Sequence, residues 1–157
     1  SYVREELLPL MRSLVEKTSL VIGEDLFFVP PQFRYELMHD CQTALAKSGT
    51  VALELALHRK PSLILYALTQ LNYYIAKYIL RLNLPHYSIV NILGKGEIYP
   101  ELIGRNLCAA TTAEKLYEIH TDEIKRASIQ LACAEMIAQL GQQRSHQAAA
   151  QAIQELL

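Results

Sequence analysis

The stretch TALAKSGTVALELALHRKPSLILY, residues 43–66, contains the change of pattern that decides the fold. Its first four residues, 43–46, form a short apolar run typical of a buried strand, and the residues from Thr50 to about His58 predict a largely buried helix. A second apolar run at 62–66 predicts another strand. A strand, a helix of about 10 residues and a second strand make up a βαβ unit, which requires a parallel sheet.

Similar patterns continue on both sides of this stretch. Apolar residues at helical spacing predict helices over residues 4–17 and 32–41. Short β-type runs, which we interpret as further strands, occupy residues 19–23, 26–29 and 86–90. We therefore predict an α/β protein, with a Rossmann-like parallel sheet flanked by helices.

The composition changes near Thr112, where the chain becomes rich in Ala and Gln and helical in pattern, with Gly141 as a stop. We expect two parts. Residues 1–111 form a partial Rossmann-like domain, and residues 112–157 form C-terminal helices that pack on that domain or extend from it.

Charge and cysteine content limit the classes of function. The 157-residue chain is 51% hydrophobic and 20% charged with a formal net charge of −1, so it is globular and lacks the basic balance of a nucleic-acid binder. Its three cysteines are far apart and its histidines scattered, so we expect a reducing cytosol, no disulfide framework and no metal site. The apolar stretch 61–82 contains Gln70, Asn72, Lys77 and Arg81, which argues against a transmembrane span.

Ser48, Gly49 and Thr50 follow the first strand of the predicted βαβ unit directly. Ligands of open α/β sheets bind at the carboxyl ends of the strands, where the N–H groups and the dipole of the next helix favour an anion. Glycine there permits close approach of the backbone. This turn predicts a phosphate-binding site, although Ser48 as a simple N-cap is an alternative.

Glu54 shares one stripe of the predicted helix with Thr50 and His58. A carboxylate one turn beyond a phosphate can accept hydrogen bonds from both hydroxyls of a ribose. The alternative is a solvated stripe with a Glu54–His58 pair.

Two further segments carry functional candidates. Asn91 follows the predicted strand 86–90 and precedes a loop with two glycines, and Glu97 and Glu101 are further acceptors there; an ordinary turn is the alternative. The predicted helix 70–82 carries aromatic and basic residues typical of a membrane-facing helix, or of a core face with its rim: Tyr73, Tyr74, Lys77, Tyr78 and Arg81.

Four motifs in this order resemble lipid-A-disaccharide synthase: ALAKSGTVALELAL, KPSLILY, LNYYIAKYILRL and VNILGKGEIYPEL. The resemblance is densest between residues 44 and 107, and the closing AAAQAIQELL is similar to that family's terminal helix. It implies the C-terminal, donor-nucleotide half of a two-domain GT-B glycosyltransferase that works on the cytoplasmic face of the Gram-negative inner membrane, as a peripheral protein.

The implied reaction moves 2,3-diacylglucosamine from its UDP donor to 2,3-diacylglucosamine 1-phosphate, without a cofactor. By resemblance, Ser48, Gly49 and Thr50 hold the diphosphate and Glu54 the ribose, while Asn91 and Glu101 belong to the donor site. The partners expected are these two substrates, the membrane surface and the N-terminal half of the enzyme, which supplies the base. A homodimer is one way to cover an apolar face left exposed without that half.

The sequence also departs from the family. Its glycine-serine-arginine loop would lie before Ser1, and residues 17–31 are shorter than its strand-helix-strand passage. Ala67 replaces a basic residue and Val90 a proline. Two other interpretations stay open: another GT-B transferase or UDP-sugar epimerase domain, and a non-catalytic membrane-surface or interaction module.

Overall fold

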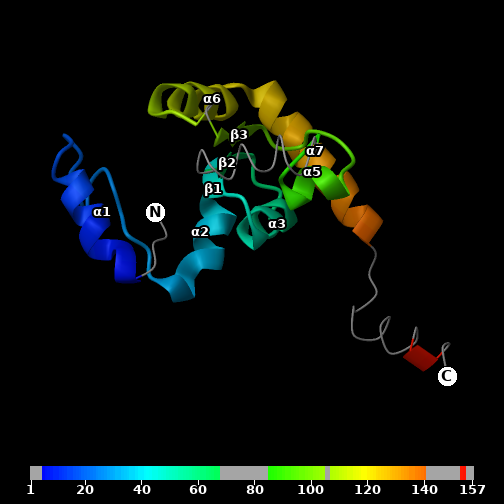
Figure 1. Cartoon of the computed structure of the whole chain (residues 1–157), viewed down its shortest axis with the longest axis horizontal. Coiled ribbons are helices and arrows are strands. Elements are labelled where there is room, and N and C mark those ends of the chain that lie inside the picture. The colour runs from blue at the N-terminus through cyan, green and yellow to red at the C-terminus, as the bar shows by residue number, and fades with distance from the viewer. Residues whose placement is uncertain (1–4, 68–84, 105–106, 141–152, 155–157) are drawn as a thin grey trace, which may run out of the picture. The chain divides into compact units, whose positions relative to one another are not determined.

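The computed structural model describes residues 5–67, 85–104, 107–140 and 153–154 of the chain (Figure 1). The chain divides into two compact units, Ser1–Gln42 and Thr43–Leu157. Each unit is described by itself.

The first unit contains two short helices, each preceded by a 3-10 turn. The predicted helix 4–17 is confirmed as η1 (Glu5–Leu7) and α1 (Leu8–Val15), with a proline in the first turn, where its missing N–H costs nothing. The predicted helix 32–41 is confirmed as η2 (Pro31–Phe33) and α2 (Arg34–Asp40).

The strands predicted at 19–23 and 26–29 are wrong. Only an isolated bridge between Ile22 and Leu26 forms there. The chain turns tightly instead, because the Asp25 carboxylate accepts from the Val21 N–H at 2.9 Å and the Gly23 N–H donates to the Leu26 carbonyl at 2.9 Å. In the described part of the chain, no neighbouring strand pairs with these residues. Their β propensity alone is therefore not enough to form a strand.

The second unit is an α/β structure around a parallel three-stranded sheet of order β1-β2-β3. The strands are β1 (Ala44–Lys47), β2 (Ser62–Tyr66) and β3 (Glu101–Ile103), and α3 (Thr50–Leu57) joins the first two. Within its described residues, the unit also contains the helices α5 (Ile89–Leu93), α6 (Ala109–Thr121) and α7 (Glu123–Leu140) (Figure 1). The predicted Rossmann-like fold is confirmed.

The central strand β2 shows that both faces of the sheet are covered. Successive side chains of a strand point to opposite faces, yet Ser62, Leu63 and Ile64 are all at most 1% exposed. The surrounding helices contribute their own buried residues: Ala52, Leu55 and Ala56 from α3, Ile119 from α6, and Ile129, Cys133 and Met136 from α7.

The strand predicted at 86–90 is also wrong, because these residues lead into α5. Ser88 is the N-cap of this helix, and its hydroxyl accepts from the Val90 N–H. Asn91 therefore lies inside a helix and not in the loop that follows a strand.

The predicted helix 70–82, with Tyr73, Tyr74, Lys77, Tyr78 and Arg81, lies outside the described residues. Among the helices that the structure describes, none is long and apolar enough to cross a membrane.

Candidate functional site

The turn between β1 and α3 begins where β1 leaves the sheet. The Ser48 N–H still donates to the Leu65 carbonyl at 2.8 Å, which extends the ladder by one bond. Gly49 follows with φ 154° and ψ −163°, a conformation that is essentially restricted to glycine. A Cβ atom at Gly49 would meet no atom within 4 Å. Glycine is therefore needed for its backbone conformation, and the space beside it is open.

The amino end of α3 lies at this turn and carries no side-chain cap. Gly49 occupies the N-cap position, so the interpretation of Ser48 as a simple N-cap is wrong. The Ser48 hydroxyl instead donates to the Tyr87 carbonyl at 3.5 Å. Gly49 and Thr50 are exposed. With no side-chain acceptor, the positive end of the helix suits an external anion.

Glu54 lies one turn beyond Thr50 on α3 and is half-buried. Residues four apart on a helix share a face, so Thr50 and Glu54 form one polar stripe on a helix whose other face packs Ala52, Leu55 and Ala56 into the core. The structure thus brings together Ser48, Gly49, Thr50 and Glu54.

A second segment meets the turn through Tyr87, whose carbonyl holds Ser48. The Glu101 carboxylate, at the start of β3, accepts from the Tyr87 N–H at 3.0 Å and from the Ser88 N–H at 2.8 Å. The Tyr87 ring packs at 5.8 Å between centroids from that of Tyr66, at the end of β2. Glu101 therefore fixes the segment that contacts Ser48, and its carboxylate bonds to Tyr87, Ser88 and Asn91.

Asn91 is fully buried and its side-chain amide makes four hydrogen bonds. Its oxygen accepts from the N–H groups of Ile98 and Tyr99, at 2.9 and 2.8 Å. Its nitrogen donates to the Tyr99 carbonyl and to Glu101, both at 2.7 Å. An amide has two donor and two acceptor positions, so these bonds use all of them. Asn91 supports Glu101 and the loop, and it has no capacity left for a ligand in this arrangement.

Tyr99 is a supporting residue that sequence reasoning missed. It is fully buried, and its hydroxyl donates to the Lys60 carbonyl at 2.8 Å and accepts from the Cys133 thiol at 3.5 Å. A tyrosine between Ile98 and Pro100 in a polar loop is the only sequence signal of this role.

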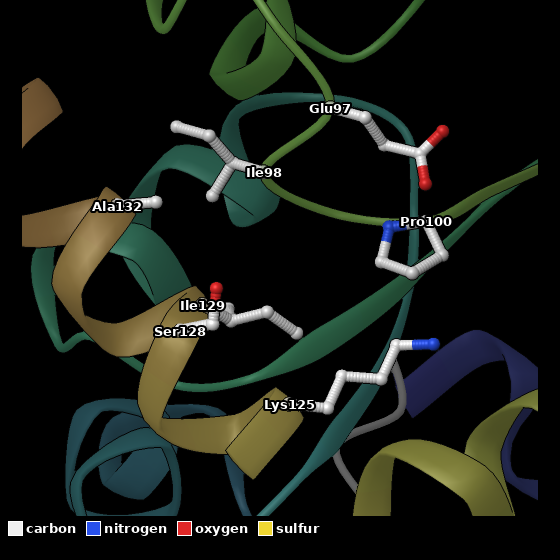
Figure 2. A pocket seen from close by; sticks show the side chains of 7 residues that line it. All are labelled: Glu97, Ile98, Pro100, Lys125, Ser128, Ile129 and Ala132. Carbon is white, nitrogen blue, oxygen red and sulfur yellow. The ribbon is translucent and has the colours of Figure 1, made fainter.

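The cavities near this region differ in size and lining. One, of about 160 Å³, is lined by Glu97 and by none of the other candidate residues (Figure 2). Glu97, Pro100 and Lys125 lie along one side of it, and the other side is lined by Ile98, Ser128, Ile129 and Ala132. It is smaller than the ~300–1,000 Å³ typical of ligand pockets. A larger cavity of about 360 Å³ adjoins Asn91 and is lined by Pro85, His86, Asn91, Ile92 and Lys95.

The side chains that could hold a metal ion are those of His, Cys, Asp and Glu. In the part of the chain that the structure describes, no group of three or more of them is placed to hold an ion.

Comparisons with known proteins point to one family. A family model described as lipid-A-disaccharide synthetase matches residues 6–156. The lipid-A-disaccharide synthase of Chlamydia muridarum is 50% identical over 76 residues, which cover 48% of this chain and 12% of that protein. The corresponding protein of Chlamydia pneumoniae is 46% identical over 76 residues, 48% of this chain and 13% of that protein.

A more distant relative extends the match. The lipid-A-disaccharide synthase of Paramagnetospirillum magneticum is 38% identical over 94 residues, 60% of this chain and 24% of that protein. The matched part is thus a quarter or less of each of these relatives. Because the family model covers nearly the whole sequence, the chain belongs to the lipid-A-disaccharide synthetase family.

Proposed function

We propose that this chain is the donor-nucleotide part of a glycosyltransferase of lipid A biosynthesis. The whole enzyme would transfer 2,3-diacylglucosamine from UDP-2,3-diacylglucosamine to 2,3-diacylglucosamine 1-phosphate, with UDP as the second product. The observation that carries the proposal is the glycine-only turn at Gly49, which places an uncapped helix end at the carboxyl edge of a parallel sheet in a chain of this family.

The diphosphate would lie against the first turn of α3. The helix fixes these N–H groups in place. They can therefore stabilise the negative charge that develops on the departing UDP without having to reorganise. The Ser48 hydroxyl is turned toward Tyr87. We therefore assign the diphosphate contact chiefly to the backbone of Gly49 and Thr50, with the Thr50 hydroxyl as an additional donor.

The ribose would lie beside Glu54, whose carboxylate accepts hydrogen bonds from vicinal hydroxyls. Asn91 and Glu101 would act as positioning residues, because Glu101 holds the Tyr87 and Ser88 N–H groups and Asn91 holds Glu101. This assignment changes the direct donor contact expected from the sequence into an indirect one.

In the chemical step, an acceptor hydroxyl attacks the anomeric carbon, the bond to the UDP oxygen breaks, and a base takes the hydroxyl proton. We propose that this base belongs to the N-terminal half, so that this chain alone is inactive. We also propose that the enzyme works at the cytoplasmic surface of the inner membrane, where both acylated sugars reside.

The test is ligand-observed NMR of UDP with the wild-type chain and Glu54→Gln, and with Glu135→Gln as the control, since Glu135 is exposed on α7. We expect saturation transfer to the uracil and ribose protons, reduced several-fold in Glu54→Gln and unchanged in Glu135→Gln. Equal transfer in all three proteins would contradict the ribose assignment. Absence of transfer in the folded wild-type chain would contradict donor binding by this turn.

A further inference from the structure

The first residue after the C-cap of α3, Arg59, is unusual for its position. The Arg59 N–H donates to the Ala56 carbonyl at 2.8 Å and the Lys60 N–H to the Leu55 carbonyl at 2.9 Å, which is the pair of bonds of a Schellman motif. At the C′ position of this motif, Arg59 has φ 53°. Glycine is the usual residue there, because a side chain makes this left-handed conformation unfavourable. An arginine occupies this position in spite of the conformational cost.

Arg59 lines a cavity of about 480 Å³ between this helix end and α7. The lining residues are His58, Arg59, Lys60, Gln130, Leu131 and Ala134, which include no acidic side chain. Within the described part of the chain, neither Arg59 nor Lys60 forms an ion pair. Two cationic side chains thus line one space in which none of the described lining residues supplies a compensating carboxylate.

The neighbouring residues locate the Arg59 charge close to α7. Burial raises the pKa of the Cys133 thiol, while the hydrogen bond with Tyr99 and the positive charge of Arg59 oppose that rise. The Tyr99 hydroxyl also holds the Lys60 carbonyl at 2.8 Å, so the backbone behind the two cations is fixed to the core. The backbone that carries the two cations is therefore held in place, so that only their side chains must be ordered when they bind a ligand.

We propose that this cavity is a phosphate-binding site that is separate from the donor-nucleotide site. A guanidinium pairs with phosphate oxygens through two parallel N–H bonds, and an ammonium adds a point charge. The volume exceeds what inorganic phosphate needs, and Leu131 is 62% exposed beside it, so the group that carries the phosphate has an apolar surface to contact. The eight residues of α3 put about 12 Å between this cavity and Gly49.

The test exploits the unusual backbone of Arg59. Arg59→Gly removes the guanidinium and also relieves the left-handed strain, so the variant should melt at a higher temperature than the wild type. Lys95→Gly is the matched control, because Lys95 is a cationic residue with φ 54° that does not line this cavity. Arg59→Lys keeps the charge but loses the two-pronged geometry.

Titration with inorganic phosphate is followed by ¹H–¹⁵N NMR at constant ionic strength, with chloride as the reference anion. We expect saturable shifts at the Gln130 and Leu131 amides, at least a tenfold weaker affinity in Arg59→Gly, an intermediate affinity in Arg59→Lys and wild-type affinity in Lys95→Gly. A second titration uses phosphatidylcholine vesicles with and without phosphatidic acid, and Arg59-dependent binding to the latter alone identifies a lipid-borne phosphate.

Arg59-dependent binding in either titration supports the proposal, and the two titrations distinguish a free from a lipid-borne ligand. A folded, more stable Arg59→Gly variant with unchanged affinity in both would overturn it. Shifts with phosphate no larger than those with chloride, together with equal binding to both kinds of vesicle, would overturn it as well. Neither result bears on UDP binding, which has its own test at Glu54.

Discussion

At Gly49, the backbone conformation alone determines which type of residue is tolerated. An alanine there would meet no atom within 4 Å, but it would have to adopt φ 154° and ψ −163°. We expect Gly49→Ala to lower the free energy of unfolding by about 1–3 kcal/mol, the usual cost of a non-glycine residue in such a region. Urea unfolding followed by circular dichroism measures this change.

The control for this substitution is Gly96→Ala. Gly96 has no left-handed φ, and the atom nearest to an added Cβ there is the Gly94 carbonyl oxygen at 4.0 Å. Gly96→Ala should leave the stability unchanged or raise it by about 0.4–1 kcal/mol through the unfolded chain. Equal losses in the two variants would show that the conformation of Gly49 carries no special cost.

Asn91 supports its neighbours through all four of its side-chain hydrogen bonds. Asn91→Ala would leave the buried Ile98 and Tyr99 N–H groups without an acceptor, at about 1–3 kcal/mol each. We therefore expect a loss of at least ~2 kcal/mol in the free energy of unfolding, measured by urea denaturation.

Asn91→Asp gives the complementary test. It keeps an oxygen for the two N–H groups but places a second carboxylate 2.7 Å from Glu101, where the amide now donates. Two adjacent carboxylates resist double ionisation, so this variant should be unstable at pH 7 and recover as the pH falls. A stability difference from the wild type that does not vary with pH would contradict this account.

The elements differ in how far the sequence predicted them. Strands β1 and β2 were predictable because they are apolar runs, and in β2 both faces are buried. Strand β3 has only three residues and begins with Glu101, so its pattern is too short to recognise. At 86–90 the N-cap of Ser88 outweighed the β propensity of its neighbours, and at 19–29 a turn did so.

The same limit applies to the candidate site. Ser48, Gly49, Thr50 and Glu54 lie within seven consecutive residues, so local spacing brings them together. The contacts of Asn91 and Glu101 depend on the path of the loop 94–100, which joins α5 to β3. No local pattern encodes that path, and the buried amide with four bonds was therefore not predictable.

The Glu118 carboxylate on α6 links this helix to α7. Glu118 pairs with Lys125 at 2.7 Å and with Lys115 at 3.1 Å. The hydrogen bond from Lys125, followed by that from Lys115, lowers the pKa of Glu118 below its ordinary value of 4.5. A carboxyl whose pKa is lower in the folded state stabilises the fold above its unfolded pKa, and this contribution disappears as the pH falls through the folded value.

Glu118→Gln should accordingly lower the melting temperature slightly at pH 7, and the difference from the wild type should vanish well below pH 4.5. High salt should reduce this difference as well, because both pairs are partly exposed to solvent. Glu114→Gln, an exposed neighbour on α6, is the control that should change nothing. A difference that persists at low pH would show that the two lysine pairs are not its cause.

At the scale of the whole molecule, the chain combines a family match over residues 6–156 with alignments that cover only 12–24% of its relatives. This is compatible with the proposed division of labour, in which one part would bind the donor and the other would supply the base and the acceptor site. Transfer would then require both parts at once. Orienting the two sugars and removing the proton of the acceptor hydroxyl each lower the activation barrier, and each would depend on a different part.

We expect this chain to bind UDP without catalysing transfer. General-base catalysis alone contributes about 10²–10⁴-fold in rate, and positioning of the acceptor contributes further, so product should form at least ~10⁴-fold more slowly than with a complete enzyme. The measurement is mass-spectrometric detection of the disaccharide after incubation with both acylated sugars, with the Chlamydia muridarum relative as the positive control. Glu54→Gln sets the background. Turnover clearly above that background, within tenfold of the complete enzyme, would show that the base lies in this chain and would overturn the proposed division between the two halves.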